Sequence, residues 1–118
     1  MKNQPFRERF AFAVNGIRAA WRREASFRVQ SAFALCALLA LLLLRPPMIW
    51  WAVFVLISAV ILAAELMNSA IEALVDRLHP EIHPEIRVIK DMAAGSVLLL
   101  SIGAIGVGLL LILAWFWR

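Results

Sequence analysis

The chain has 118 residues, of which 64% are hydrophobic, and it carries a formal net charge of +4. So much apolar surface exceeds what one small soluble core can bury, which excludes a water-soluble domain and predicts an all-α integral membrane protein. Because the basic residues flank long apolar runs, we expect the membrane as a partner and no nucleic-acid partner. Cys36 is the only cysteine in the sequence, which excludes an internal disulfide and a cysteine metal set.

The N-terminal segment predicts an amphipathic surface helix over residues 5–24. Its large apolar side chains recur every three or four residues and fall on one side of a helix: Phe6, Phe10, Val14, Ile17 and Trp21. Charged side chains occupy most of the remaining circumference, as a helix at the membrane interface requires. At Glu24 the register leaves two interpretations open. The carboxylate lies on the apolar side with a metal or cationic partner, or the helix has ended and the side chain is solvated.

Three long apolar stretches predict three membrane-spanning helices, over about residues 28–45, 48–77 and 91–117. Together with the surface helix they would form a single membrane domain over residues 1–118. A signal peptide is the alternative for the first stretch. Its basic leader is too long for that role, and no small-residue cleavage site precedes Arg45.

The distribution of basic residues predicts the orientation of these helices. Most of the twelve Lys and Arg precede the first span (Lys2, Arg7, Arg9, Arg18, Arg22, Arg23 and Arg28) or lie between the second and third (Arg77, Arg87 and Lys90), which leaves Arg45 and Arg118 for the other side. Since cytoplasmic loops carry an excess of Lys and Arg, the N-terminus is expected in the cytoplasm and the C-terminus on the outer side.

Four polar side chains share one side of the second span and its extension: Glu65, Asn68, Glu72 and Asp76. On a helix the last three lie within about 60° of the direction of Glu65. Counted from Met48, Glu65 lies about 25 Å along the axis, near the cytoplasmic edge of a hydrocarbon layer about 30 Å thick. Glu72 lies about 10 Å further, in or near water. These depths favour different roles for the two carboxylates, in which Glu72 binds the metal of a nucleotide and Glu65 contacts a lipid hydroxyl.

A duplicated motif, His79-Pro-Glu-Ile-His83-Pro-Glu-Ile, follows this helix. Its histidines have the spacing of a helical metal site, but Pro80 and Pro84 are expected to prevent a regular helix, which favours an exposed turn. Lys90 and Asp91 come next. Lys90 would neutralise phosphate, with an ordinary interfacial charge pair as the alternative. The sequence has no Walker lysine loop, so any phosphate chemistry falls to the membrane helices.

Three blocks of the sequence resemble the signature blocks of the small bacterial integral-membrane diacylglycerol kinases. They are Arg18-Ala-Ala-Trp21-Arg-Arg-Glu24-Ala-Ser-Phe27-Arg28, then Glu65-Leu-Met-Asn68-Ser-Ala-Ile-Glu72-Ala-Leu-Val-Asp76-Arg77, and Glu81-Ile-His83 with Lys90-Asp91-Met92. The resemblance implies a homotrimer in the bacterial inner membrane whose active sites are shared between subunits. It also implies transfer of the γ-phosphate of MgATP to the hydroxyl of diacylglycerol, which yields phosphatidic acid. A sibling of the same fold phosphorylates undecaprenol, and residue types do not firmly separate the two substrates.

The resemblance also assigns roles to individual residues. It implies that Glu65 is the catalytic base and that Glu24 and Glu72 bind Mg²⁺. Around ATP it places Phe12, Glu24, Glu72, Glu81, His83, Lys90 and Asp91. Around the lipid it places Arg18, Ala19, Ala20, Trp21, Ser26, Phe27, Arg28, Gln30, Glu65, Asn68 and Ala94. Three positions depart from the commonest family pattern, because Gln30 replaces Glu, Phe12 replaces Tyr and Ala94 replaces Ser.

A small proton-coupled transporter is the alternative from another functional class, since such proteins also use a membrane carboxylate. A transporter would place that carboxylate near the middle of the bilayer and would usually have four spans. Here three spans are predicted and the acidic residues collect at one edge, which disfavours transport.

Overall fold

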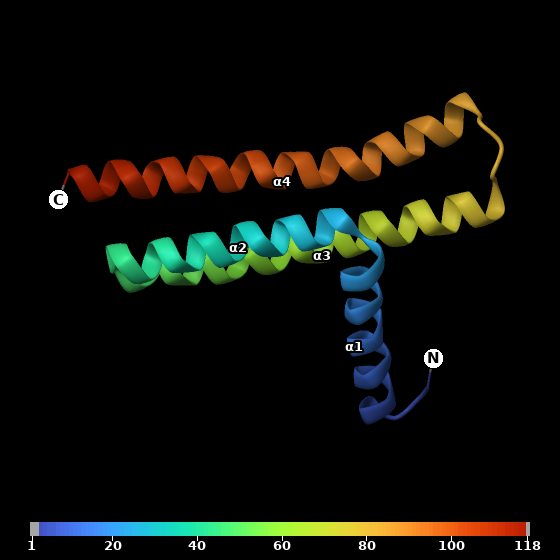
Figure 1. The fold of residues 1–118 in the computed structure, drawn as a ribbon, viewed down its shortest axis with the longest axis horizontal. Helices are drawn as coiled ribbons and strands as arrows, with labels where there is room; N and C mark the ends of the chain where they lie inside the picture. Colours follow the sequence, from blue (N-terminus) through green and yellow to red (C-terminus); the bar gives the residue numbers. More distant parts are fainter. Residues whose placement is uncertain (1–2, 118) are drawn as a thin grey trace.

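A computed structural model of the protein describes residues 3–117, so Lys2 and Arg118, which entered the predicted orientation, lie outside the described residues. Within this range the chain forms four helices, α1 (Phe6–Arg23), α2 (Ala25–Leu44), α3 (Met48–Leu78) and α4 (Pro84–Phe116). Helices α2, α3 and α4 run alongside one another, whereas α1 runs across their direction (Figure 1). Each of these three is long and apolar enough to cross a membrane, which confirms the predicted all-helical class with three spans.

Helices α1 and α2 meet at Glu24, a single residue with extended backbone between them (φ −116°, ψ 107°). The Glu24 amide still donates to the carbonyl of Ala20 at 2.8 Å. Arg28 reinforces this corner, because its guanidinium donates to the carbonyl oxygens of Trp21 at 2.6 Å and Arg22 at 3.3 Å. Such carbonyls at a helix end lack partners within their own helix. The chain therefore turns within one residue, so that α2 begins at residue 25 where the sequence predicted a start near 28.

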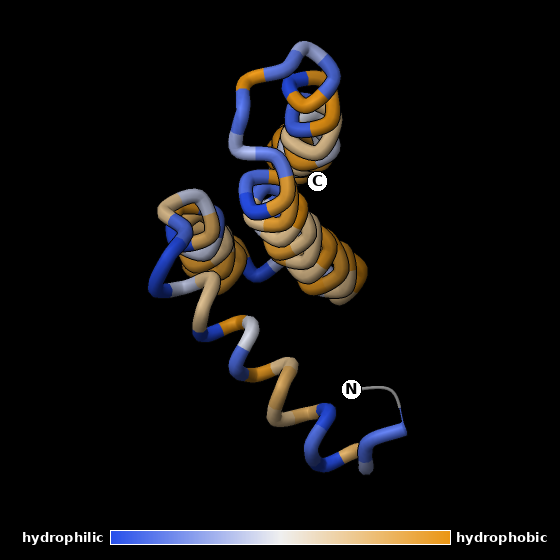
Figure 2. Tube along the Cα trace, turned by 90° about the vertical axis from the view of Figure 1, so that its right-hand side faces the viewer, coloured by the Kyte–Doolittle hydropathy of each residue, from blue (hydrophilic) through white to orange (hydrophobic). Residues whose placement is uncertain are grey.

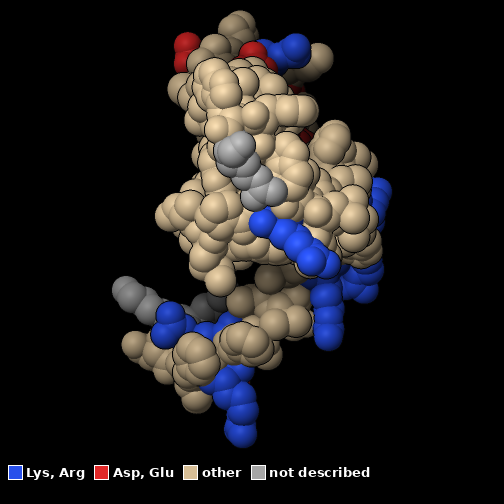
Figure 3. Space-filling model, turned by 90° about the vertical axis from the view of Figure 1, so that its left-hand side faces the viewer, with Lys and Arg blue, Asp and Glu red and all other residues tan. Residues whose placement is uncertain are grey.

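The apolar side of α1 is uncovered in the single chain, with Phe6 77% and Trp21 51% exposed. Figure 2 shows apolar and polar residues alternating along α1, while α2, α3 and α4 are mostly hydrophobic. In Figure 3, Arg side chains gather along α1 in the lower part of the view. Exposed aromatic groups beside basic ones are what a helix on a membrane surface needs, and that location stays a prediction.

Helix α3 is central to the fold because it packs against each of the other three helices. Its buried residues Ile61, Glu65 and Ser69 follow at four-residue spacing and so form one line along the helix. Most large apolar side chains elsewhere are exposed in the single chain. That pattern is typical of helices whose surroundings are lipid rather than water.

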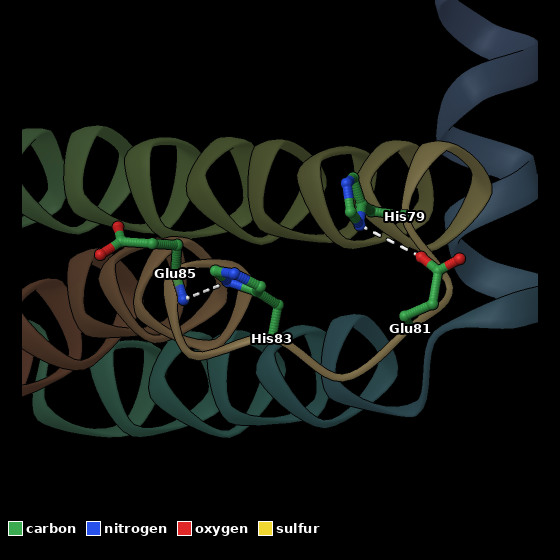
Figure 4. Close-up of polar contacts among 4 residues, drawn as sticks. All are labelled: His79, Glu81, His83 and Glu85. Carbon is green, nitrogen blue, oxygen red and sulfur yellow. Dashed lines mark hydrogen bonds and ion pairs between the residues drawn. The ribbon is translucent and has the colours of Figure 1, made fainter.

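Helix α4 begins at Pro84, earlier than the predicted start of the third span near residue 91. The expected exposed turn is confirmed for residues 79–83, and the helix begins directly after it, at Pro84. Proline fits the first helical position, where its missing N–H has no intrahelical partner to lose. His83 caps this helix, since its Nδ1 accepts a hydrogen bond from the Glu85 amide at 3.1 Å (Figure 4).

His79 ends α3, and its Nδ1 lies 3.2 Å from the Glu81 carboxylate (Figure 4). His79, Glu81 and His83 are all exposed in the connection between α3 and α4. Each histidine has a partner of its own, so the duplicated motif forms a capped turn between two helices.

Candidate active site

Glu65 is the most deeply buried polar side chain described, at 3% exposure. The hydroxyl of Ser26 on α2 donates to its Oε2 at 3.0 Å. Within residues 3–117 no Lys, Arg or His forms an ion pair with Glu65. Burying a carboxylate without a cationic partner costs free energy, so this arrangement serves poorly as a structural element. It leaves an oxygen of Glu65 available to a ligand. Glu65 lies at the end expected to face the lipid in the polar column, the line of side chains formed by Glu65, Asn68, Glu72 and Asp76.

Asn68 and Glu72 form the next part of the column. Asn68 Nδ2 donates to Glu72 Oε1 at 3.5 Å, and Asn68 Oδ1 is buried with no hydrogen-bond partner among residues 3–117. A buried acceptor of this kind calls for a donor or a cation. Mg²⁺ is usually bound by one or two carboxylates together with water and substrate phosphates, so these oxygen atoms fit it chemically. In the described part of the chain no three His, Cys, Asp or Glu gather into a group that could hold a metal ion.

Glu24 is half-buried and lines a pocket of about 150 Å³ between α1 and α3. This combines the two interpretations left open by the sequence, because the helix has ended at Glu24 but its carboxylate is not fully solvated. On α3 the pocket is lined by Ser69 and Ala73, among others, and not by Glu72. Consecutive helical residues diverge by about 100°, which explains why Ala73 faces the pocket and its neighbour Glu72 does not. One chain therefore does not gather Glu24 and Glu72 in this pocket.

Lys90 links α4 to the end of the column. Its Nζ lies 2.5 Å from Oδ1 of Asp76, whereas the neighbouring Asp91 pairs with Arg87, Nε to Oδ1, at 3.5 Å. Lys90 and Asp91 are therefore not partners of one another. Lys90 remains one-third exposed, so its positive charge is accessible from the aqueous end of the helices.

The remaining predicted residues differ in their surroundings. Phe12, Arg18, Trp21, Glu81, His83 and Ala94 are exposed in the single chain. Ala19 and Ala20 line the pocket beside Glu24, and Phe27 is buried. Gln30 Nε2 donates to Ser101 Oγ of α4 at 3.2 Å. Ser101 was missed by sequence reasoning, although an isolated hydroxyl in an apolar span was a signal for it.

Known proteins are similar to this chain over most of its length. Residues 11–112 match the family described as prokaryotic diacylglycerol kinase. The chain is 33% identical over 94 residues to the diacylglycerol kinase of Escherichia coli K12, an alignment that covers 80% of this chain and 77% of that protein. It is 34% identical over 100 residues to the diacylglycerol kinase of Synechocystis, covering 84% of this chain but 57% of the longer relative.

Similarity also extends to a second kind of kinase. The undecaprenol kinase of Bacillus subtilis is 32% identical over 108 residues, which covers 92% of this chain and 88% of that protein. The match to the family extends from α1 to α4 and includes Glu24, the polar column and Lys90. The chain therefore belongs to the prokaryotic diacylglycerol kinase family.

Proposed function

We propose that the protein is a lipid kinase of the bacterial cytoplasmic membrane, which transfers the γ-phosphate of MgATP to the hydroxyl of diacylglycerol and yields phosphatidic acid. Membership of the family supports kinase activity. The structural observation that carries the proposal is Glu65, buried to 3% exposure beside Ser26 where α2 leaves the surface helix. A lipid hydroxyl lies at this depth, and a carboxylate is a suitable acceptor for its proton.

Phosphoryl transfer depends on positioning, charge neutralisation and a proton acceptor rather than on covalent catalysis. Glu65 would accept the hydroxyl proton as the lipid oxygen attacks the γ-phosphorus and the bond to the ADP oxygen breaks. Ser26 holds one carboxylate oxygen and so orients the other. Lys90, from the aqueous side, would neutralise negative charge on the phosphates.

Glu24, Glu72 and the unpaired oxygen of Asn68 are the groups that would hold Mg²⁺. The bound ion would neutralise the β- and γ-phosphates. The nucleotide is then required at the end of the helices that carries Glu72 and Lys90. The excess of basic residues at that end supports a cytoplasmic location for it, where ATP is available.

Undecaprenol is the second candidate acceptor, because the alignment with the undecaprenol kinase covers more of both chains than that with the Escherichia coli diacylglycerol kinase. The two functions are separated by an assay of the purified protein in bilayers with γ-labelled ATP, Mg²⁺ and either lipid alcohol. We expect label in phosphatidic acid, with a higher kcat/KM for diacylglycerol. A higher kcat/KM for undecaprenol would establish the second candidate, and no label in any lipid would contradict both.

Loss of the Ser26 hydroxyl should affect turnover more than nucleotide binding. Ser26→Ala removes the hydrogen bond to Glu65, so the carboxylate is less well oriented, and we expect kcat to fall about tenfold. The KM for ATP should change little, because the hydroxyl lies on the lipid side of the site. Ser26→Thr should recover most of the loss. An equal fall in kcat in Ser26→Ala and Ser26→Thr would contradict a positioning role for Ser26. A rise in the KM for ATP with kcat unchanged would contradict it as well.

The Asp76–Lys90 pair should compete with ATP for the lysine. In Asp76→Asn the charge of Lys90 is free, so we expect the KM for ATP to fall by up to about fivefold at low salt. Added salt should reduce this difference, because it screens exposed charges. Kinetics at two ionic strengths provide the check. A higher ATP KM in the variant would show instead that Asp76 positions Lys90 for binding.

A further inference from the structure

A groove of about 560 Å³ runs along α2, α3 and α4, on the side of Glu65 away from Glu72. On α2 its lining includes Gln30 and Ala34, which continue the line of Ser26 at four-residue spacing. On α3 it includes Ile61, one turn from Glu65. The groove therefore begins beside the Ser26–Glu65 pair. It is almost entirely apolar, which suits the hydrocarbon chain of a lipid whose hydroxyl reaches Glu65.

Gln30 is a polar exception at the Glu65 end of this groove. Its Nε2 donates to Ser101 Oγ at 3.2 Å and so connects α2 to α4. The amide has a second N–H and a carbonyl oxygen, for which residues 3–117 provide no further partner. In a hydrocarbon environment an unpaired amide group carries a free-energy cost. A polar group on the molecule that occupies the groove would remove that cost.

The position of Gln30 along α2 indicates which polar group of the bound lipid would contact its amide. Gln30 lies one turn, about 6 Å, beyond Ser26 along α2, and Ser26 contacts the proposed base. In a 1,2-diacylglycerol one of the two ester groups is on the glycerol carbon next to the one that bears the hydroxyl, and its carbonyl follows the ester oxygen. With the hydroxyl at Glu65, an ester carbonyl therefore falls in the region of the Gln30 amide. A polyprenol continues from its hydroxyl as hydrocarbon and offers no acceptor there.

We propose that Gln30, held by Ser101, donates its free N–H to an ester carbonyl of the acceptor lipid and thereby selects glycerolipids over polyprenols. This inference rests on the proposed lipid kinase function and makes Gln30 a determinant of substrate class. Ser101 is a positioning residue, since it acts through the orientation of the Gln30 amide. The ratio of kcat/KM between an ester lipid and an otherwise matched lipid without carbonyls measures the contact directly.

The test compares diacylglycerol with a dialkylglycerol ether of the same chain length and with undecaprenol, in wild type and Gln30→Leu. Wild type should prefer the diester over the diether by about five- to tenfold, the effect of one hydrogen bond. In Gln30→Leu this ratio should fall close to one, and the preference for diacylglycerol over undecaprenol should shrink by a similar factor. Ser101→Ala should reduce the ratio partly, and Ser101→Thr should restore it.

Ser31→Ala is the matched control, because the Ser31 hydroxyl lies beside Gln30 in sequence but donates to the Phe27 carbonyl of its own helix at 2.9 Å. This variant should keep the wild-type ratio of diester to diether. Equal use of diester and diether by wild type, or an unchanged ratio in Gln30→Leu, would overturn the inference while leaving the kinase function intact. Absence of phosphate transfer to any of the three lipids would overturn the proposed function, and the inference with it.

Discussion

Replacement of Glu65 by Gln is expected to lower kcat by at least ~10². The amide keeps the size of the carboxylate and can still accept the hydrogen bond from Ser26, but it cannot take the proton of the lipid hydroxyl. Nucleotide affinity should change little, since Glu72 lies about 10 Å further along α3. Steady-state kinetics with ATP and lipid varied independently would separate these effects.

The matched variant for this test is Glu65→Asp, which keeps a proton acceptor on a shorter side chain. We expect it to retain more turnover than Glu65→Gln, because misplacement of a base is less damaging than its removal. Thermal unfolding of both variants provides the folding control. Near-normal turnover in Glu65→Gln would reduce Glu65 to a structural or positioning role and would remove the proposed base.

Neutralisation of either metal carboxylate should change the Mg²⁺ requirement. In Glu72→Gln and Glu24→Gln, we expect the Mg²⁺ and ATP concentrations for half-maximal activity to rise by about tenfold or more, because a charged oxygen ligand is lost. The dependence on lipid concentration should change much less. Titration of Mg²⁺ at fixed ATP and lipid measures this difference.

His79→Ala is the control for the metal assignment, because His79 is exposed and pairs with Glu81 rather than with the column. Its Mg²⁺ titration should resemble that of wild type. Unaltered titrations in both carboxylate variants would contradict the roles of Glu24 and Glu72. A large loss in His79→Ala would indicate that the connection between α3 and α4 binds metal after all.

Helical periodicity was sufficient to predict the three spans and the polar column, because both depend on residues of one helix. The ends of helices were harder to predict. Proline can stop a helix or begin one, and at Pro84 the second outcome holds. The corner at Glu24 has no Gly or Pro, so only the change from an amphipathic pattern to a continuous apolar run indicated the break, and the predicted end at residue 24 lies one residue from the observed end at Arg23.

Contacts between helices were outside the reach of periodicity. Ser26 meets Glu65, Gln30 meets Ser101 and Lys90 meets Asp76 only after the helices have taken their relative rotations and depths. A sequence pattern defines the sides of each helix but not which sides meet. The proximity of Glu24 to α3 could not be predicted for the same reason, because it depends on how α1 packs across the other helices. Roles for Ser26, Gln30 and Glu24 therefore came from the family resemblance, and the contacts of all these residues came from the structure.

A working lipid kinase of this kind needs its proton acceptor and metal ligands around one phosphate, and one chain does not supply that arrangement. Glu24 faces the pocket between α1 and α3, whereas Glu72 contacts Asn68 outside it. The large apolar surface of the single chain leaves room for further copies within the membrane. We therefore propose that the homotrimer implied by the family resemblance has sites that combine Glu65 and Glu72 of one copy with residues around Glu24 of another.

Subunit mixing tests this most directly. Glu65→Gln and Glu24→Gln subunits are unfolded together, refolded as mixed trimers and assayed for transfer of labelled phosphate to diacylglycerol, at an Mg²⁺ concentration low enough that each variant alone is expected to have little activity. Because some sites would then combine an intact Glu65 from one subunit with an intact Glu24 from another, we predict recovery of part of the wild-type activity. Trimers shown to contain both variants but still inactive would contradict shared sites and would place both carboxylates of each site in a single chain.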